Sequence, residues 1–173
     1  MTHNIHPSPI RYQGVMVSST FEDLSEHRSA LIKAIKGQGL TDVAMENDSA
    51  KARVDLIDSS LQMVRDSAAY VGIISHKYGQ IPKCPKRNPK NLSTTELEFD
   101  EAQRLNRPTL LFIMGDKHQV MPGNVETNAS KRKKLSGFRE RAKKMTHDSD
   151  VHRVYATFES LEEFKSQAIH AVA

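Results

Sequence analysis

Short apolar runs alternate with longer segments of helical periodicity along nearly the whole chain, and this alternation most constrains the fold. We predict five strands, over residues 14–18, 42–45, 69–74, 109–114 and 151–158. We predict five helices, over residues 19–36, 50–66, 94–106, 130–145 and 161–172. Strands that alternate with helices in this way favour a parallel sheet covered by helices on both faces.

Five such units with right-handed crossovers predict an α/β three-layer sandwich of flavodoxin-like type, with strand order 2-1-3-4-5. In such a sheet, ligands bind beyond the carboxyl ends of the strands, where the strand order reverses. Here that point lies between the first and third strands. Ser18, Ser19 and Thr20 follow the first strand, and residues 75–79 follow the third. The helix start at residues 93–98 is expected to fold back over the same edge.

The length and composition fit one intracellular domain. The 173 residues carry 25 Lys and Arg against 21 acids, which gives a mildly basic net charge of +4. We expect residues 1–11 to form a flexible segment and residues 12–173 a single domain. The single cysteine excludes a disulfide framework and fits a reducing compartment. With no long apolar run and no leader-like segment, we expect a cytoplasmic protein that does not enter membranes.

Motifs for common nucleotide and metal chemistry are absent. The chain has no P-loop, no G-x-G-x-x-G after the first strand and no G-x-S-x-G nucleophile elbow. Its eight histidines are scattered without ligand spacing, so we predict no metal site. Candidate functional residues must therefore be found among charges that fall on apolar helix faces.

Two glutamates at the start of the helix predicted over residues 94–106 have different explanations. The apolar face of this helix is formed by Leu97, Phe99, Ala102 and Leu105. Glu98 projects near the middle of that face, whereas Glu96 points to the opposite side. Ser93 and Glu96 match a capping box, which explains Glu96 as a structural cap. Thr95 and Glu98 could form an alternative capping box, which would explain Glu98 structurally. We favour Glu98 as a functional carboxylate, because it lies on a buried face beside the predicted crevice.

Arg28 falls near the centre of the apolar face of the helix predicted over residues 19–36. A charge there must be paired or must reach a cleft. We favour pairing with a core carboxylate, and a place in the ligand pocket is the alternative. The candidate partners are Glu46, Asp55 and Asp58. Residues 19–22 also match a capping box, and their hydroxyl and N–H groups would equally suit an anion.

The helix predicted over residues 130–145 is strongly basic, but a core stripe runs between its charges. This stripe is formed by Leu135, Phe138, Ala142 and Met145. A solvated basic face is therefore the favoured interpretation, and nucleic-acid binding is the weaker one, since no surface aromatics interleave with the charges. Four basic residues of the long loop lie nearer the crevice and could attract a phosphorylated ligand: Lys83, Lys86, Arg87 and Lys90.

Two segments together resemble the domain of unknown function 4062 family. The first is VMVSSTFEDL at residues 15–24, followed by Glu26-His27-Arg28. The second runs from VGII at residues 71–74 through Lys77-Tyr78-Gly79 to STTELEF at residues 93–99. The family is similar to TIR domains and nucleoside deoxyribosyltransferases, whose helix glutamate stands four residues before a small residue.

This resemblance implies an N-glycosidase that uses Glu98, with Ala102 as the small residue. NAD or a related nucleotide would be the substrate, with no separate cofactor. Tyr78 would stack on a base or ribose. The other residues expected to contact substrate are Ser18, Ser19, Thr20, Arg28, Gly79, Ser93 and Thr95.

The resemblance also implies a setting for the domain. It suggests self-association, a role in bacterial antiphage defence or signalling, and fused or partner NACHT, ATPase or repeat modules. The alternative is a non-catalytic oligomerisation or signalling module with a nucleotide-sensing pocket.

Overall fold

The structure is a computed structural model that describes residues 14–44, 56–144 and 153–173. Five parallel strands form one sheet: β1 (Val15–Ser19), β2 (Asp42–Val43), β3 (Ala69–Ile74), β4 (Thr109–Met114) and β5 (Arg153–Phe158). Their order is β2-β1-β3-β4-β5, as the sequence predicts. Five α-helices connect or follow them: α1 (Ser25–Gly37), α2 (Leu56–Asp66), α3 (Thr94–Arg104), α4 (Ala129–Lys143) and α5 (Leu161–Val172). A short 3₁₀ turn covers Pro122–Asn124.

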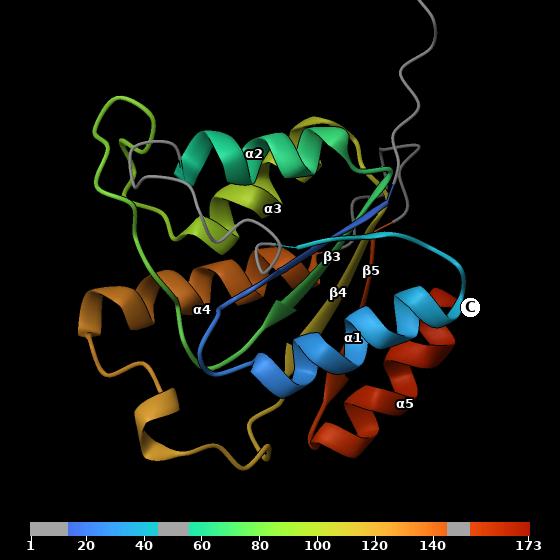
Figure 1. The fold of residues 1–173 in the computed structure, drawn as a ribbon. Coiled ribbons are helices and arrows are strands. Elements are labelled where there is room, and N and C mark those ends of the chain that lie inside the picture. Colours follow the sequence, from blue (N-terminus) through green and yellow to red (C-terminus); the bar gives the residue numbers. More distant parts are fainter. Residues whose placement is uncertain (1–13, 45–55, 145–152) are drawn as a thin grey trace, which may run out of the picture.

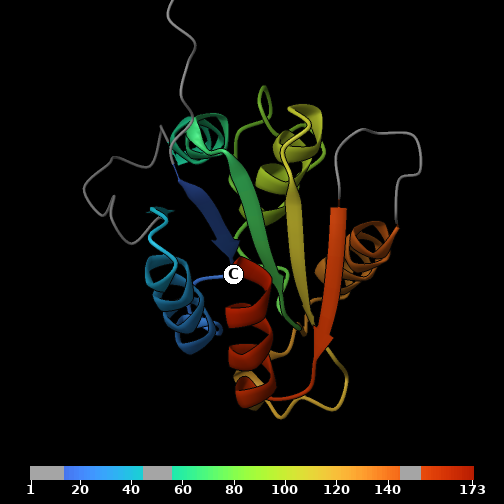
Figure 2. The same cartoon turned by 90° about the vertical axis from the view of Figure 1, so that its right-hand side faces the viewer.

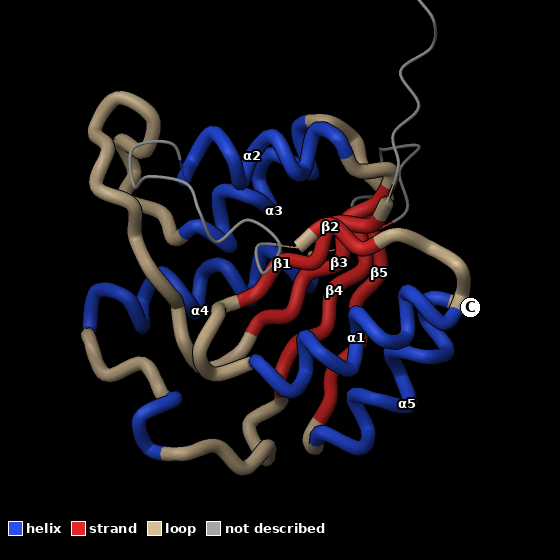
Figure 3. Tube along the Cα trace, in the orientation of Figure 1, coloured by secondary structure: helices blue, strands red, loops and turns tan. Residues whose placement is uncertain are grey.

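The helices cover the sheet on both sides and form the predicted three layers. Helices α1 and α5 lie on one face, and α2, α3 and α4 lie on the other (Figures 1 and 2). Each face has its own buried cluster: Phe112, Phe158 and Phe164 belong to the cluster on the side of α1 and α5, and Tyr70 and Phe99 lie in the opposite cluster. The α/β sandwich is therefore confirmed, and Figure 3 shows the strands gathered between the helical layers.

The first helix begins later than the sequence predicts. Helix α1 starts at Ser25, and its N-cap residue, Leu24, makes no side-chain capping bond. The predicted capping box at residues 19–22 is therefore wrong, and residues 20–24 form a loop. Arg28 Nη1 donates to the carbonyl oxygens of Thr20 and Phe21, at 3.3 and 3.2 Å. The carbonyls of Thr20 and Phe21 thus bind a side chain of α1 and take no part in a helix.

Other boundaries differ by less. Strand β2 spans only two residues. The predicted flexible segment 1–11 lies outside the described residues, as do residues 45, 50–55, 145 and 151–152 of the predicted strands and helices. No helix in the described ranges is both long and apolar enough to cross a membrane.

Candidate functional site

Glu98 lies at the point where the strand order reverses. This residue of α3 is 3% exposed. Ser18 Oγ donates a hydrogen bond to one carboxylate oxygen, Oε2. Ser60 Oγ donates to the other, Oε1. Three segments that are distant in sequence thus meet at one carboxyl group.

Local sequence patterns place each of these three side chains. Ser18 stands two residues after Met16 on β1, so both face the layer of α2 and α3. Ser60 belongs to the buried face of α2, with Ile57 and Val64. Helix α3 is fixed at its start by the N-cap Ser93, whose Oγ accepts from the N–H of Glu96 at 3.3 Å.

The surroundings of Glu98 change its protonation. Burial raises the pKa of Glu98 to about 7, against the lowering effects of the Ser18 and Ser60 hydrogen bonds and of the Arg28 charge. Near neutral pH the carboxyl group therefore populates both its charged and its neutral form. A buried acid with such a pKa can stabilise a cation or exchange a proton with a ligand.

Glu98 opens onto a pocket of about 320 Å³. Six of the residues that we expected to act on substrate line it: Ser18, Ser19, Thr20, Arg28, Thr95 and Glu98. The remaining lining residues are Val17, Phe21, Glu22, Leu56, Gln80 and Thr94. The structure thus brings the predicted polar groups together at the predicted edge of the sheet.

Arg28 lines this pocket rather than pairing with Asp58, which binds Arg87 instead. The other two predicted partners, Glu46 and Asp55, lie outside the described residues. The guanidinium carbon lies 4.4 Å from the centre of the Phe21 ring. Burial lowers the pKa of Arg28, and the charges of Asp23 and Glu98 oppose that change.

Three of the expected contact residues do not line the pocket. Tyr78 is 1% exposed, and its hydroxyl donates to Glu96 while it accepts from the N–H of Ser93 at 3.2 Å. Its ring is therefore a core element, which corrects the expected stacking on a base or ribose. Ser93 is the fully buried N-cap of α3. Gly79 has a φ of 88°, and its carbonyl accepts from Lys131 Nζ at 3.0 Å.

Glu96 has a structural role, but not as the acceptor of a closed capping box. Its buried carboxylate accepts hydrogen bonds from Tyr78 and from Arg141 of α4. The N–H of Ser93, which a capping box would assign to Glu96, donates to Tyr78 instead. Glu96 therefore joins the loop before α3 to α4, while Glu98 faces the pocket.

Several basic side chains of α4 hold the loop that leads to the site. Lys131 donates to the carbonyl of Gly79, and Lys134 Nζ donates to the carbonyls of Lys90 and Asn91 at 2.7 and 2.8 Å. Arg139 donates to the carbonyl of Ser75, the residue after β3, and to that of Met114, the last residue of β4. Part of the basic face therefore serves the fold directly.

Sequence reasoning did not identify Ser60 or Phe21. Ser60 could have been found as a polar residue on the helical stripe of Ile57 and Val64. Phe21 is 62% exposed at the pocket, and only its place beside the first strand could have suggested a role.

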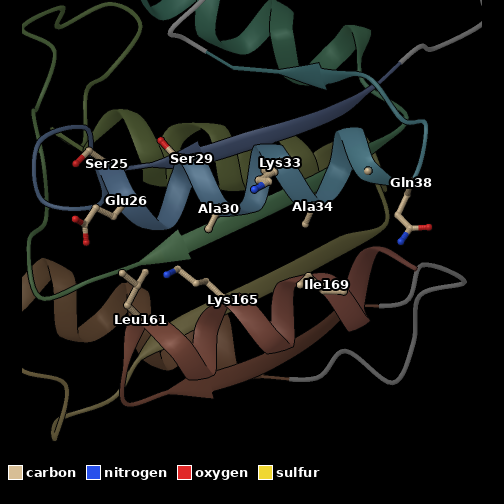
Figure 4. Close-up of a pocket in the computed structure, with 11 residues that line it drawn as sticks. Ser25, Glu26, Ser29, Ala30, Lys33, Ala34, Gln38, Leu161, Lys165 and Ile169 are labelled. Atoms are coloured by element: carbon tan, nitrogen blue, oxygen red, sulfur yellow. The ribbon is translucent and has the colours of Figure 1, made fainter.

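A larger hollow lies elsewhere, between α1 and α5 (Figure 4). It measures about 790 Å³, and its charged lining residues are Glu26, Lys33 and Lys165. None of these three is buried, so the hollow lacks the desolvated acid that marks the smaller pocket. Within the described residues, no cluster of three His, Cys, Asp or Glu side chains could hold a metal ion.

A family model identifies the family of the chain. The model of the domain of unknown function DUF4062 matches residues 14–173, so the chain belongs to this family. The curated proteins contain no significant match. One similar solved structure is the Clostridium botulinum CMP N-glycosidase BcmB, at 12% identity over 90% of this chain and 96% of that chain, with a TM-score of 0.49. Another is a prokaryotic SEFIR domain, at 13% identity over 75% and 90%, with a TM-score of 0.41.

Proposed function

We propose that this member of the DUF4062 family hydrolyses the N-glycosidic bond of a nucleotide-type substrate such as NAD, with Glu98 at the anomeric carbon. The observation that carries the proposal is the buried Glu98 carboxylate, held by two serine hydroxyls at the wall of a polar pocket. Cleavage of an N-glycosidic bond passes through an oxocarbenium-like cation. A carboxylate withdrawn from water stabilises such a cation more strongly than an exposed one does.

The chemistry requires one bond to break and one to form. The bond between the anomeric carbon and the base nitrogen breaks, and its electron pair leaves with the base. Water supplies the new bond to the anomeric carbon and gives up a proton. For NAD, the nicotinamide nitrogen is positively charged before cleavage, so the base leaves neutral without being protonated. Glu98 then serves as the anion that stabilises the cation or bonds to it.

The protonation of Glu98 suits a cationic substrate. Because burial raises the pKa of Glu98 to about 7, a positive charge bound beside it favours the carboxylate form. Binding of such a substrate would therefore generate the charged group that the reaction needs. A substrate with a neutral base would instead use the protonated form as an acid.

The rest of the pocket suits the polar parts of a nucleotide. Ser19 and Thr20 present hydroxyl groups at the end of β1, and Arg28 places a positive charge beside them. Ribose hydroxyls and a phosphate are the chemical partners of such groups. We assign these three residues to substrate binding, with Thr95 on the facing helix.

The direct test is release of free base. Concentrated protein would be incubated with NAD and with nucleosides, in the presence of a crowding agent, and free base measured by chromatography. We expect Glu98→Gln to abolish release, because the amide keeps the shape of the side chain and removes its charge. The loss expected is at least 100-fold.

A matched control lies one turn further along α3. Glu101 pairs with Arg65 and Arg104 and does not line the pocket. Glu101→Gln should therefore retain release. Undiminished release by Glu98→Gln would contradict the assignment of Glu98.

A second function has an observation in its favour. Both oxygens of Glu98 already accept serine hydrogen bonds, and the side chain is 3% exposed. A non-catalytic signalling module that senses nucleotides would show this arrangement and would bind nucleotide without releasing base. Self-association, a role in defence and fused NACHT, ATPase or repeat modules belong with this candidate as further proposals.

A further inference from the structure

A second hollow adjoins the pocket of Glu98 and measures about 520 Å³. Three residues line both hollows: Leu56 at the start of α2, Gln80 in the loop after β3, and Thr94 at the start of α3. The two hollows are therefore compartments of one cleft. We call the pocket of Glu98 the acidic compartment, and the hollow beside residues 80–84 the apolar compartment. A ligand that passes Gln80 extends from one compartment into the other.

The two compartments differ in the chemistry of their walls. The acidic compartment presents hydroxyl groups and charges. Among the described residues that line the apolar compartment, Lys83 carries the one charge. Its hydrocarbon walls come from Leu56, Ile57, Ile81 and Pro82. Such walls suit the flat, weakly polar faces of a nucleobase, whereas the acidic compartment suits a ribose.

The loop that forms one wall of the apolar compartment is fixed by its own hydrogen bonds. The side-chain amide of Asn88, which is 1% exposed, donates to the carbonyls of Pro82 and Leu92 at 3.1 and 2.8 Å. Asn88 Oδ1 accepts from the N–H of Leu92 at 2.8 Å. Arg87 of the same loop binds Asp58 of α2. The wall is therefore formed before a ligand arrives, which spares the ordering cost that a flexible loop adds to binding.

The basic residues of this loop have different positions relative to the cleft. Lys83 lines the apolar compartment, whereas Lys86 is not among the residues that line either compartment. Arg87 is engaged with α2. Arg28 lines the acidic compartment. Each compartment therefore contributes one cation to an anionic linker that joins the two halves of a ligand.

We propose that the apolar compartment binds the second nucleoside of a dinucleotide, so that the substrate class of this site is two nucleosides joined by a diphosphate. The acidic compartment, at about 320 Å³, is near the lower end of the roughly 300–1,000 Å³ of ligand pockets and suits one nucleoside. The base to be released lies at Glu98, the other base packs against the apolar walls, and the diphosphate binds Arg28 and Lys83. This inference rests on the proposed function, whose site it extends.

The first experiment compares the affinities of NAD and nicotinamide mononucleotide by isothermal titration calorimetry of Glu98→Gln, which is expected to cleave neither. Both ligands carry the same nicotinamide, so the missing charge of Glu98 cancels in the ratio of their Kd values. We expect NAD to bind about 10-fold tighter or more, because it alone reaches the apolar compartment. Equal affinities would overturn the proposal.

A pair of charge reversals in the same loop tests the contribution of Lys83. In the Glu98→Gln background, Lys83→Glu should reduce the preference for NAD about 3-fold or more, because a cation beside the diphosphate becomes an anion. Lys86→Glu makes the same change of charge at an exposed residue outside both compartments and should keep the preference. An equal reduction in both variants would show a general effect of charge and contradict the assignment.

Cys84 reports on the apolar compartment without any substitution of its walls. It is the one cysteine of the chain, is half-buried and lines this compartment. Its reaction with N-ethylmaleimide can be followed by mass spectrometry in Glu98→Gln. Saturating NAD should slow the reaction about 5-fold or more, and saturating nicotinamide mononucleotide should leave the rate unchanged. Equal rates with and without NAD, or equal protection by the two ligands, would overturn the proposal.

These measurements separate the inference from the proposed function. If the wild type releases no base, the hydrolase fails, whereas tighter binding of NAD and protection of Cys84 would still establish a dinucleotide cleft in a sensing module. If the wild type releases nicotinamide from NAD and from the mononucleotide with equal kcat/KM, and Cys84 is not protected, the hydrolase stands and the second compartment is refuted.

Discussion

Glu98 and His27 are buried titratable groups on opposite faces of the sheet, and their surroundings differ in kind. Burial raises the pKa of Glu98 to about 7 and lowers the pKa of His27 to about 4. Glu98 has two hydroxyl donors and opens onto a pocket. The ring of His27 lies 5.1 to 5.3 Å from those of Phe158, Phe164 and His118, and its Nε2 lies 3.3 Å from His118 Nε2.

The difference shows that a shifted pKa does not by itself identify a site. In both places loss of water favours the neutral form. Only at Glu98 do hydroxyl groups, a nearby arginine and an open pocket accompany the shift. The combination of a desolvated charge with access for a ligand, rather than burial alone, distinguishes the candidate site from the aromatic packing around His27.

The two groups should also make stability depend on pH in opposite directions. The larger change in the free energy of unfolding is expected for Glu98→Gln. Between pH 4.5 and 7 the folded protein binds a proton at Glu98 that the unfolded chain has lost, so Glu98 destabilises the fold as the pH rises. We expect Glu98→Gln to raise the free energy of unfolding by about 3 kcal/mol at pH 8 and by less at pH 5. Urea denaturation at both pH values measures this, with the exposed Glu140→Gln as control. A lower stability of Glu98→Gln at pH 8 would count against a desolvated carboxylate.

His27 should act in the other direction. Between pH 6.5 and 4 the unfolded chain binds a proton that the folded protein refuses, so stability falls as the solution is acidified. The wild type should lose about 2 kcal/mol between pH 8 and pH 5 through this group. In His27→Gln that part of the loss should disappear. His170→Gln, which alters an exposed residue of α5, should keep the wild-type slope, and an equal slope in all three proteins would show that His27 is not desolvated.

The smallest effect concerns one hydrogen bond at the site. Ser60→Ala removes the donor to Glu98 Oε1 and should lower the free energy of unfolding by about 1–2 kcal/mol at pH 8. The cost should shrink at pH 5, where the carboxyl group is neutral. The same denaturation series measures this change. A cost that does not depend on pH would mean that Ser60 contributes to packing alone.

The sequence was sufficient for the fold and for the buried position of Glu98, because both follow from periodicity. Alternating apolar runs set the strand order, and helical spacing placed Glu98 on a buried face. Ser60 could not be assigned in this way, since its role depends on which side chain of α2 meets Glu98. The start of α1 was wrong for a related reason. The local capping signal at residues 19–22 competes with tertiary contacts, in which Arg28 binds loop carbonyls and Ser75 Oγ donates to Asp23.

The register between β1 and β3 also has a consequence for the order in which the protein forms during synthesis. Val15 pairs with Ala69, and Glu98 then closes on Ser18 and Ser60. A nascent chain therefore exposes β1 without its central neighbour until β3 has left the ribosome. The walls of the pocket come from segments that are far apart in the sequence and leave the ribosome at different times. The contacts of Glu98 can therefore form only after α3 has emerged, and the loop contacts of Lys131 and Lys134 form later still, once α4 follows.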